Sequence, residues 1–212
     1  MSPITNPALN ALLAESLDGE GFVLAHVVIR RNAGAGYDLR HVVDATTPVT
    51  QLRAVKVSEL RNLAQFTIAG EFRPLKSAPT LVPGWRALAA DPASLESALN
   101  QLYPGALADW FTARQAVPPV THYREFAGRQ TGMYQVTATL DDRRVGEVIA
   151  ATCVPTACLK RRLWTVAGMA IDPSATKSCI PCLEPCALFL DAARRAARKD
   201  SVLAVPPANA LG

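Results

Sequence analysis

The chain has 212 residues, of which 50% are hydrophobic and only 19% are charged. This composition excludes a largely disordered chain and suffices for one large domain or two small ones. The formal net charge is a mild +4, and aromatic residues make up only 6% of the chain. Without a concentrated basic stripe or many stacking rings, nucleic acid is not expected as a partner.

The first predicted elements form a β-hairpin. Residues 22–30 (FVLAHVVIR) and 37–43 (YDLRHVV) are rich in β-branched and aromatic residues, and a glycine-containing loop over 32–36 separates them. His26 and His41 fall inside the two strands, where they can face each other across the hairpin. A pair of histidines in a sheet is more often structural than metal-binding, so we expect a structural role.

Helices are expected to follow the hairpin. Residues 47–66 begin with Thr-Pro and repeat apolar residues at roughly helical spacing, which predicts a helix. Residues 73–85 contain three prolines and a glycine and are predicted as a loop. Asp91 and Pro92 then open a helix, and a shorter one is expected over 107–114. The inner face of the first of these two helices would carry Leu95, Ala98, Leu99 and Leu102.

A second part of the chain is expected after Pro118 and Pro119, the best candidate boundary. The elements predicted beyond it are a strand over 133–140, a helix capped by Asp141 and running to about 151, a strand over 163–171 and a final helix over about 187–199. The fold class is therefore α+β. An N-terminal hairpin-and-helix domain would occupy residues 1–118, and a cysteine-rich α+β domain would occupy residues 119–212.

All five cysteines lie in the last third of the chain. They are Cys153, Cys158, Cys179, Cys182 and Cys186, with spacers of four, twenty, two and three residues. Random placement would scatter them, so this grouping indicates a shared site. Thiolates are soft ligands that select iron–sulfur clusters or zinc. A cubane cluster needs four of them, which leaves one to spare.

The neighbours of the cysteines favour a cluster over zinc. The basic run Lys160–Arg162 follows Cys158 directly, and its charge would offset that of a thiolate-bound cluster. Cys186 precedes the final predicted helix, whose free N–H groups can face cluster sulfur. Two cysteine pairs about twenty residues apart also resemble a zinc ribbon, although their inner spacings and the fifth cysteine fit one poorly. Structural zinc and thiol redox chemistry therefore remain open from residue chemistry alone.

Three strings in this part of the chain resemble a known domain. They are CLKRRLW at 158–164, PCLEPC at 181–186 and, upstream, RQTGMY at 129–134. They look like the 4Fe-4S domain that extends CbiX-type sirohydrochlorin cobaltochelatases, and the resemblance covers roughly residues 106–199. The region before it resembles the stabilising domain of that family. The chelatase portion with its metal-handling histidines has no counterpart here, so chelatase activity is not carried over.

The resemblance implies a 4Fe-4S cluster and a set of residues around it. The matching positions make Cys153, Cys158, Cys182 and Cys186 the ligands, with Cys179 as the extra cysteine. The surrounding residues singled out from the sequence are Arg129, Lys160, Arg161 and Trp164. Of these, Trp164 is expected to cover the cluster. Arg129 is either a solvated loop residue or a hydrogen-bond donor to cluster sulfur or to a carboxylated ligand.

The expected function is one-electron transfer or redox sensing by a 4Fe-4S cluster, near tetrapyrrole or cobalamin metabolism. A redox protein or a tetrapyrrole-pathway enzyme would be the partner. The rival is a structural protein whose zinc or cluster only stabilises the fold. No acid–base pair or activated nucleophile can be recognised, so an enzyme on its own is not expected. The sequence shows no secretory signal and no apolar run near ~20 residues, so a cytoplasmic protein without a membrane partner is expected.

Overall fold

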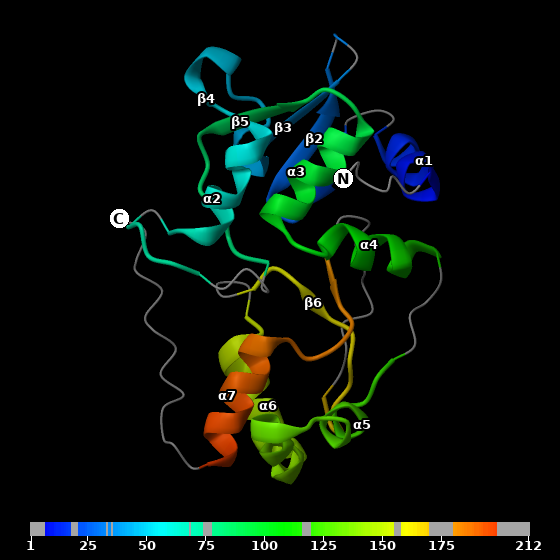
Figure 1. Ribbon diagram of the computed structural model, residues 1–212, viewed down its shortest axis with the longest axis vertical. Helices are drawn as coiled ribbons and strands as arrows, with labels where there is room; N and C mark the ends of the chain where they lie inside the picture. The colour runs from blue at the N-terminus through cyan, green and yellow to red at the C-terminus, as the bar shows by residue number, and fades with distance from the viewer. Residues whose placement is uncertain are drawn as a thin grey trace.

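The computed structural model divides the chain into a sheet-containing N-terminal region and a helical C-terminal region, drawn above and below each other in Figure 1. It describes residues 7–198 except 18–20, 33, 35, 68, 74–77, 116–119, 155–157 and 170–179. The predicted boundary at Pro118 and Pro119 lies outside the described residues. No helix in the described part is long and apolar enough to cross a membrane.

A five-stranded sheet forms the centre of the N-terminal region, in the order β1-β2-β3-β5-β4. Its strands are β1 (Phe22–Leu24), β2 (Val27–Arg31), β3 (Tyr37–His41), β4 (Arg53–Val55) and β5 (Trp85–Ala89). Only β4 is parallel to its neighbour β5; the other pairs are antiparallel. The helices of this region are α1 (Pro7–Ser16), α2 (Leu60–Gln65), α3 (Pro92–Leu102) and α4 (Ala106–Gln115).

The predicted hairpin is confirmed for β2 and β3, whose register places Val27 opposite His41. The first predicted strand is longer than the observed one, because the chain turns at Ala25, which has a positive φ of 51°. That turn makes β1 and β2 a second hairpin. His26 lies in this turn and not inside a strand as predicted, but its ring still meets that of His41 edge-on, with centroids 4.9 Å apart.

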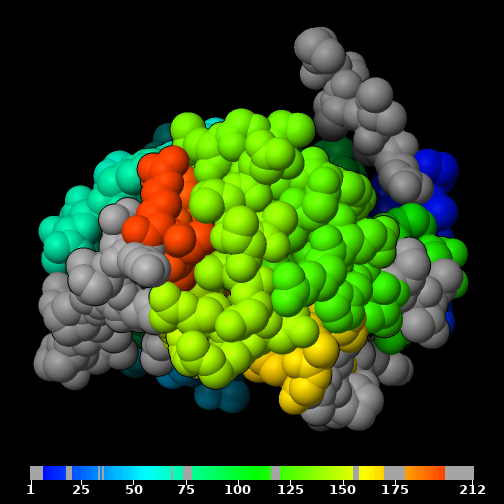
Figure 2. All heavy atoms as spheres, turned by 90° about the horizontal axis from the view of Figure 1, so that it is seen from below, coloured from blue at the N-terminus to red at the C-terminus, as the bar shows by residue number. Residues whose placement is uncertain are grey.

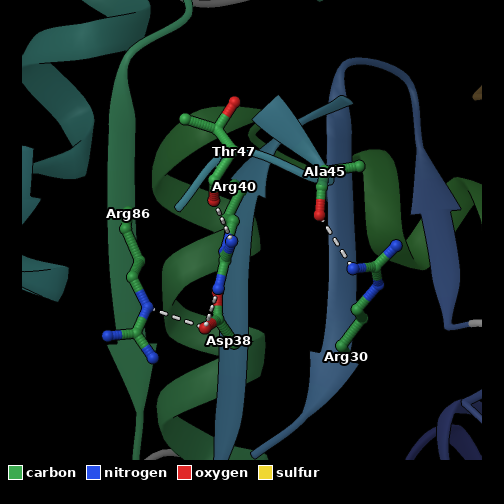
Figure 3. Close-up of polar contacts among 6 residues, drawn as sticks. All are labelled: Arg30, Asp38, Arg40, Ala45, Thr47 and Arg86. Carbon is green, nitrogen blue, oxygen red and sulfur yellow. Dashed lines mark hydrogen bonds and ion pairs between the residues drawn. The ribbon is translucent and has the colours of Figure 1, made fainter. Parts of the chain in front are cut away.

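One surface of the sheet carries a buried acid between two arginines (Figure 3). Asp38 on β3 accepts hydrogen bonds from Arg40 at 2.8 and 3.0 Å and from Arg86 on β5 at 2.7 Å. Burial alone would raise the pKa of Asp38, but these two guanidinium groups lower it below its ordinary value. The ion pair between Asp38 and Arg86 therefore links β3 to β5, whereas the pair between Asp38 and Arg40 lies within β3.

Two predictions for the N-terminal region are wrong. Residues 47–66 are not one helix: β4 lies among them, preceded by a 3-10 turn (Val49–Gln51) and followed by another (Val57–Glu59) that leads into α2. Pairing of β4 with β5 overrides the helical spacing there. The loop predicted over 73–85 ends one residue too late, since Trp85 begins β5 and is buried. The helices predicted from Asp91 and over 107–114 are confirmed as α3 and α4.

The C-terminal region is built from three helices and a long 3-10 segment around a small aromatic core. Its elements are α5 (Tyr123–Gly128), the 3-10 segment η4 (Gly132–Thr139), α6 (Asp142–Thr152), β6 (Arg161–Arg162), β7 (Pro181–Cys182) and α7 (Ala187–Ala197). Seen from below, η4, α6 and α7 cover this end of the molecule side by side (Figure 2). Tyr123, Trp164 and Phe189 meet in the core, with ring centroids 5.0 to 6.2 Å apart.

The predicted strands of this region are wrong, whereas its predicted helices are confirmed. Residues 133–139 belong to η4 instead of a strand, and the hydroxyls of Thr137 and Thr139 donate to the carbonyls three residues earlier. No strand forms over the described residues 163–169, which follow β6 and contain only isolated bridges at Thr165, Val166 and Met169; residues 170–171 lie outside the described residues. Asp141 caps α6 by accepting a hydrogen bond from the N–H of Arg144 at 2.7 Å. The final helix is observed as α7; position 199 lies outside the described residues.

The two regions meet at the chain segments that flank β6 and β7. The N–H of Leu159 donates to the carbonyl of Ala78 at 2.9 Å, and the fully buried Ile180 packs in the N-terminal core. Lys160 forms an ion pair with Asp109 of α4 at 2.9 Å. The segments that carry the second and fourth cysteines are therefore anchored on the N-terminal region, while the other two described cysteines lie at helix ends of the C-terminal region.

Candidate metal centre

Two of the predicted ligands lie at facing ends of two packed helices. Cys153 is the residue at which α6 ends, and its N–H donates to the carbonyl of Ile149 at 2.8 Å. The inner face of α6 buries Val145, Val148 and Ile149 against the aromatic core, which fixes the end of the helix. Cys186 precedes the first residue of α7 in an extended conformation and makes no side-chain cap of its own. Its thiol is therefore available to another partner.

The other two ligands are placed by short backbone contacts. Strands β6 and β7 run parallel, with Arg162 opposite Cys182. The N–H of Leu163 donates to the carbonyl of Cys182 at 2.9 Å, which closes the ladder beyond that pair. Cys158 is held by a hydrogen bond from its N–H to the carbonyl of Val154 at 2.9 Å. Pairing of β6 with β7 thus brings Cys182 close to the segment that follows Cys158, although the twenty-residue spacer lies between them in the sequence.

These four cysteines line one pocket. The remaining residues that line it are Thr152, Lys160, Arg162, Trp164, Leu188 and Phe189. All four thiols are free of disulfides. Among the described residues, no three His, Cys, Asp or Glu side chains lie close enough to share a single metal ion. The thiols instead surround the pocket, and Cys179 lies outside the described residues.

The surroundings of the thiols disfavour a bare thiolate. Burial raises the pKa of Cys153 to about 11, against a lowering by the hydroxyl of Thr152 and with further raising by nearby Cys186 and Cys158. Burial likewise raises the pKa of Cys182 to about 12. Such thiols stay protonated at neutral pH until a bound cation compensates the charge of the thiolate. The pocket is therefore suited to thiolates that are neutralised by metal.

Trp164 presents an unpaired donor to this pocket. Its side chain is completely buried, and its indole Nε1–H has no hydrogen-bond partner among the described residues. The indole nevertheless lies near enough to Cys182 to lower the pKa of that thiol, against the larger opposing effect of burial. The contact is thus an approach that falls short of full hydrogen-bond geometry. A buried donor beside sulfur fits a site in which the sulfur carries negative charge.

The basic residues of the CLKRRLW string alternate in their roles. Lys160, Arg162 and Trp164 line the pocket, whereas Arg161 between them does not. The guanidinium of Arg162 lies 5.3 Å from the ring centroid of Trp164 and donates to its backbone carbonyl. The sequence prediction named Arg161 and left Arg162 out of the expected site. The two-residue period of an extended segment, counted from Lys160, would have selected Arg162.

Arg129 acts on the loop that joins two of the cysteines. Its guanidinium forms an ion pair with Glu184 at 3.0 Å and lies over the ring of Phe126. Glu184 belongs to the PCLEPC string, and its carbonyl accepts a hydrogen bond from the thiol of Cys182 at 3.2 Å. Arg129 is therefore bonded to the ligand loop and is absent from the residues that line the pocket.

Comparison with known proteins identifies the kind of protein to which this fold and pocket belong. The family described as the 4Fe-4S iron–sulfur cluster binding domain matches residues 115–195. This is an iron–sulfur protein, and its cofactor is a 4Fe-4S cluster. The DR2241 stabilising domain matches residues 8–114, half of the chain, and the chain belongs to that family. The resemblance seen in the sequence is thereby confirmed.

A solved structure shares this arrangement. DR2241 from Deinococcus radiodurans superimposes with a TM-score of 0.75 at 28% sequence identity, over 92% of this chain and 42% of that one. It is described as a multi-domain protein with structural similarity to chelatases and with two additional novel domains. The present chain therefore spans less than half the length of DR2241. A comparison with curated proteins found no match.

Proposed function

We propose that this protein holds its 4Fe-4S cluster through Cys153, Cys158, Cys182 and Cys186. We further propose that it passes single electrons or senses redox state in the cytoplasm, in association with tetrapyrrole or cobalamin metabolism. The observation that carries the proposal is the common pocket: four thiols from two distant stretches of the chain, 153–158 and 182–186, line one space. A cubane takes one thiolate at each of four irons, so its ligands surround the group and do not converge on one atom.

The residues around the thiols suit an iron–sulfur site. Lys160 and Arg162 bring positive charge to the pocket that the four cysteines line. Positive charge offsets the net negative charge of a thiolate-bound cluster. Trp164 and Phe189 are both buried and form one wall, which restricts water. A bound 4Fe-4S cluster supplies one chemistry here, the uptake and release of single electrons.

The proposed pathway rests on resemblance. The strings around the cysteines resemble the extension of cobaltochelatases, and DR2241 is itself described as structurally similar to chelatases. A fold alone is a weak guide to function, so this part of the proposal needs its own support. A redox protein or a tetrapyrrole-pathway enzyme would be the partner. Copurification of such a protein with the cluster-bound chain, lost when the cluster is removed, is the outcome expected.

Anaerobic purification tests the proposed cofactor use most directly. We expect brown protein with a broad visible absorption band and about four irons and four sulfides per chain. Dithionite should bleach the band, and reoxidation should restore it with the iron retained. Stoichiometric zinc without iron or sulfide would contradict the proposal at its base.

The rival function, a purely structural cluster, has one observation in its favour. The pocket lies where the ends of α6 and α7 meet β7, and the chain beside β6 is bonded to the N-terminal region through Leu159 and Lys160. A group bound there would brace all of these elements. The reduction experiment separates the two functions, because a purely structural cluster would keep its iron and would not cycle reversibly at accessible potentials.

A further inference from the structure

Among the described residues that line the pocket, Trp164 has a buried side-chain N–H without a hydrogen-bond partner. An N–H without a partner in a protein interior is destabilising, and such groups are rare unless a ligand or ion completes them. Trp164 is fully buried, and its Nε1–H has no partner among the described residues. Cys182 lines the same pocket as Trp164 and packs against the aromatic core to which Trp164 belongs.

The ring is held so that it cannot turn away from the pocket. Phe189 packs edge-on against it with centroids 5.0 Å apart, and Tyr123 lies at 6.2 Å. Arg162 covers the ring at 5.3 Å and bonds to the carbonyl of the same residue. Arg162 is also opposite Cys182 in the ladder of β6 and β7. The backbone pairing that places the sulfur therefore also places the donor.

We propose that the indole N–H of Trp164 donates a hydrogen bond to the iron-bound sulfur of Cys182 and thereby raises the reduction potential of the cluster. This inference rests on the proposed ligand set. A thiol is a weak acceptor, whereas a metal-bound thiolate carries charge and accepts more strongly. Reduction adds one negative charge to the cluster, so a donor at sulfur stabilises the reduced form more than the oxidised form.

The test compares two tryptophan variants of the cluster-bound protein. Trp164→Phe keeps a ring against Phe189 and removes the N–H. Trp85→Phe is the matched control, because Trp85 is equally buried with an unpartnered indole N–H but belongs to the sheet core and does not line the pocket. Iron and sulfide content is measured first, followed by the midpoint potential in an electrochemical titration.

We expect Trp164→Phe to keep about four irons and to make reduction about tenfold less favourable, a fall of ~59 mV for one electron. Trp85→Phe should leave the potential unchanged. Electron–nuclear double resonance on the reduced cluster should show one proton coupling that exchanges in deuterated water and is missing only in Trp164→Phe. An unchanged potential in Trp164→Phe, or an equal fall in Trp85→Phe, would overturn the inference.

A second replacement keeps the test decisive if Trp164→Phe loses its iron. Benzothienylalanine at position 164 has the bicyclic shape of tryptophan with sulfur in place of the N–H, so it fills the same space. The same fall in potential is expected with it, and an unchanged potential contradicts the inference. If the unaltered protein binds no cluster, the proposed function is wrong. If it binds a cluster that is reduced and reoxidised reversibly, but removal of the indole N–H leaves the reduction potential unchanged, only the present inference is wrong.

Discussion

The two regions of this protein are stabilised in different ways. In the described part of the chain, the N-terminal core contains 25 buried apolar residues, built from the sheet and from α1 to α4. The C-terminal core contains 10, and three of its cysteines pack against it from one side. One of the 25, Ile180, comes from the C-terminal part of the chain. Apart from Ile180, the first region thus closes on its own side chains, and the second borders the pocket that receives the cluster.

This difference indicates which of the two regions depends on the cofactor for its stability. The cysteine segments before β6 and at β7 are far apart in sequence, and bringing them together costs loop-closure entropy. A two-residue ladder between β6 and β7 offsets little of that cost. Binding energy at a site that the unfolded chain lacks becomes folding energy. We therefore infer that the cluster stabilises the C-terminal region and contributes much less to the sheet.

Removal of the cluster should have the largest effect on the difference in stability between the two regions. We expect protein stripped of iron to lose order after about residue 150 while residues before 115 stay folded, because only the second region lacks a large core. Limited proteolysis of the two forms, with fragments identified by mass, measures this directly. The N-terminal core of the cluster-bound form is its internal control. Equal resistance of the C-terminal third in both forms would mean that this region is held by its own side chains.

Single cysteine variants should show which thiols bind the cluster that stabilises the C-terminal region. Alanine at Cys153, Cys158, Cys182 or Cys186 removes one of four thiolates, so each should abolish or degrade the cluster. Cys179→Ala is the matched control and should retain nearly all of its iron. Iron, sulfide and the visible spectrum are measured for each. Loss of the cluster in Cys179→Ala with retention in Cys182→Ala would show that the ligand set is wrong.

The sequence predicted best those elements that are set by local chemistry. Helices α3 and α6 were found because Asp91 and Asp141 are strong capping residues, and each side chain does accept a backbone N–H. Strand β4 and the segment η4 were not found. In both, distant partners decide the conformation: β5 pairs with β4, and η4 packs on α7 while Tyr123 donates to the carbonyl of Thr137. Such contacts leave no short-range signal.

The candidate site was likewise predicted only in part. Cysteine spacing and resemblance selected four thiols, and the structure places those four around one pocket. The role of Phe189 as a wall could not be read from the sequence, because its contact with Trp164 joins α7 to a segment more than twenty residues earlier. Arg129 had been assigned either to solvent or to the cluster. Its side chain is 54% exposed, in agreement with the first assignment, and it pairs with Glu184, a partner that no local pattern indicates.

Acid should weaken the N-terminal region through its histidine pair. Burial lowers the pKa of His26, and burial together with the neighbouring His26 lowers that of His41, while Asp44 opposes the shift. Because the unfolded chain then binds protons that the folded one does not, stability is fully present above the unfolded value of ~6.5 and is lost as the pH falls toward the lowered pKa of the folded state. We expect a loss on the order of 1 kcal/mol in urea unfolding between pH 7.5 and pH 5.5.

The histidine prediction has its own control within the chain. Iron-free protein isolates the N-terminal transition if the second region is already disordered, and its unfolding is followed there. His41→Gln should flatten the pH dependence, because Gln does not titrate. His122→Gln, at the start of α5, should leave it unchanged. An equally steep pH dependence in His41→Gln would show that other groups cause the acid sensitivity.

The smallest expected effect concerns the ion pair that joins the two regions. Lys160 and Asp109 lie 2.9 Å apart with side chains 15% and 33% exposed, so a double-mutant cycle with Lys160→Met and Asp109→Asn should give a coupling of ~0.5–1 kcal/mol in cluster-bound protein. The matched pair Arg143 and Glu147 lies within α6 and is more exposed, so its coupling should be smaller and should not report contact between regions. If the segment after Cys153 loses order without iron, the Lys160–Asp109 coupling must vanish in the stripped protein, because its two partners no longer meet. A coupling that persists after removal of the cluster would show that β6 stays packed on α4 without iron. The dependence of the second region on iron would then be confined to the ends of α6 and α7.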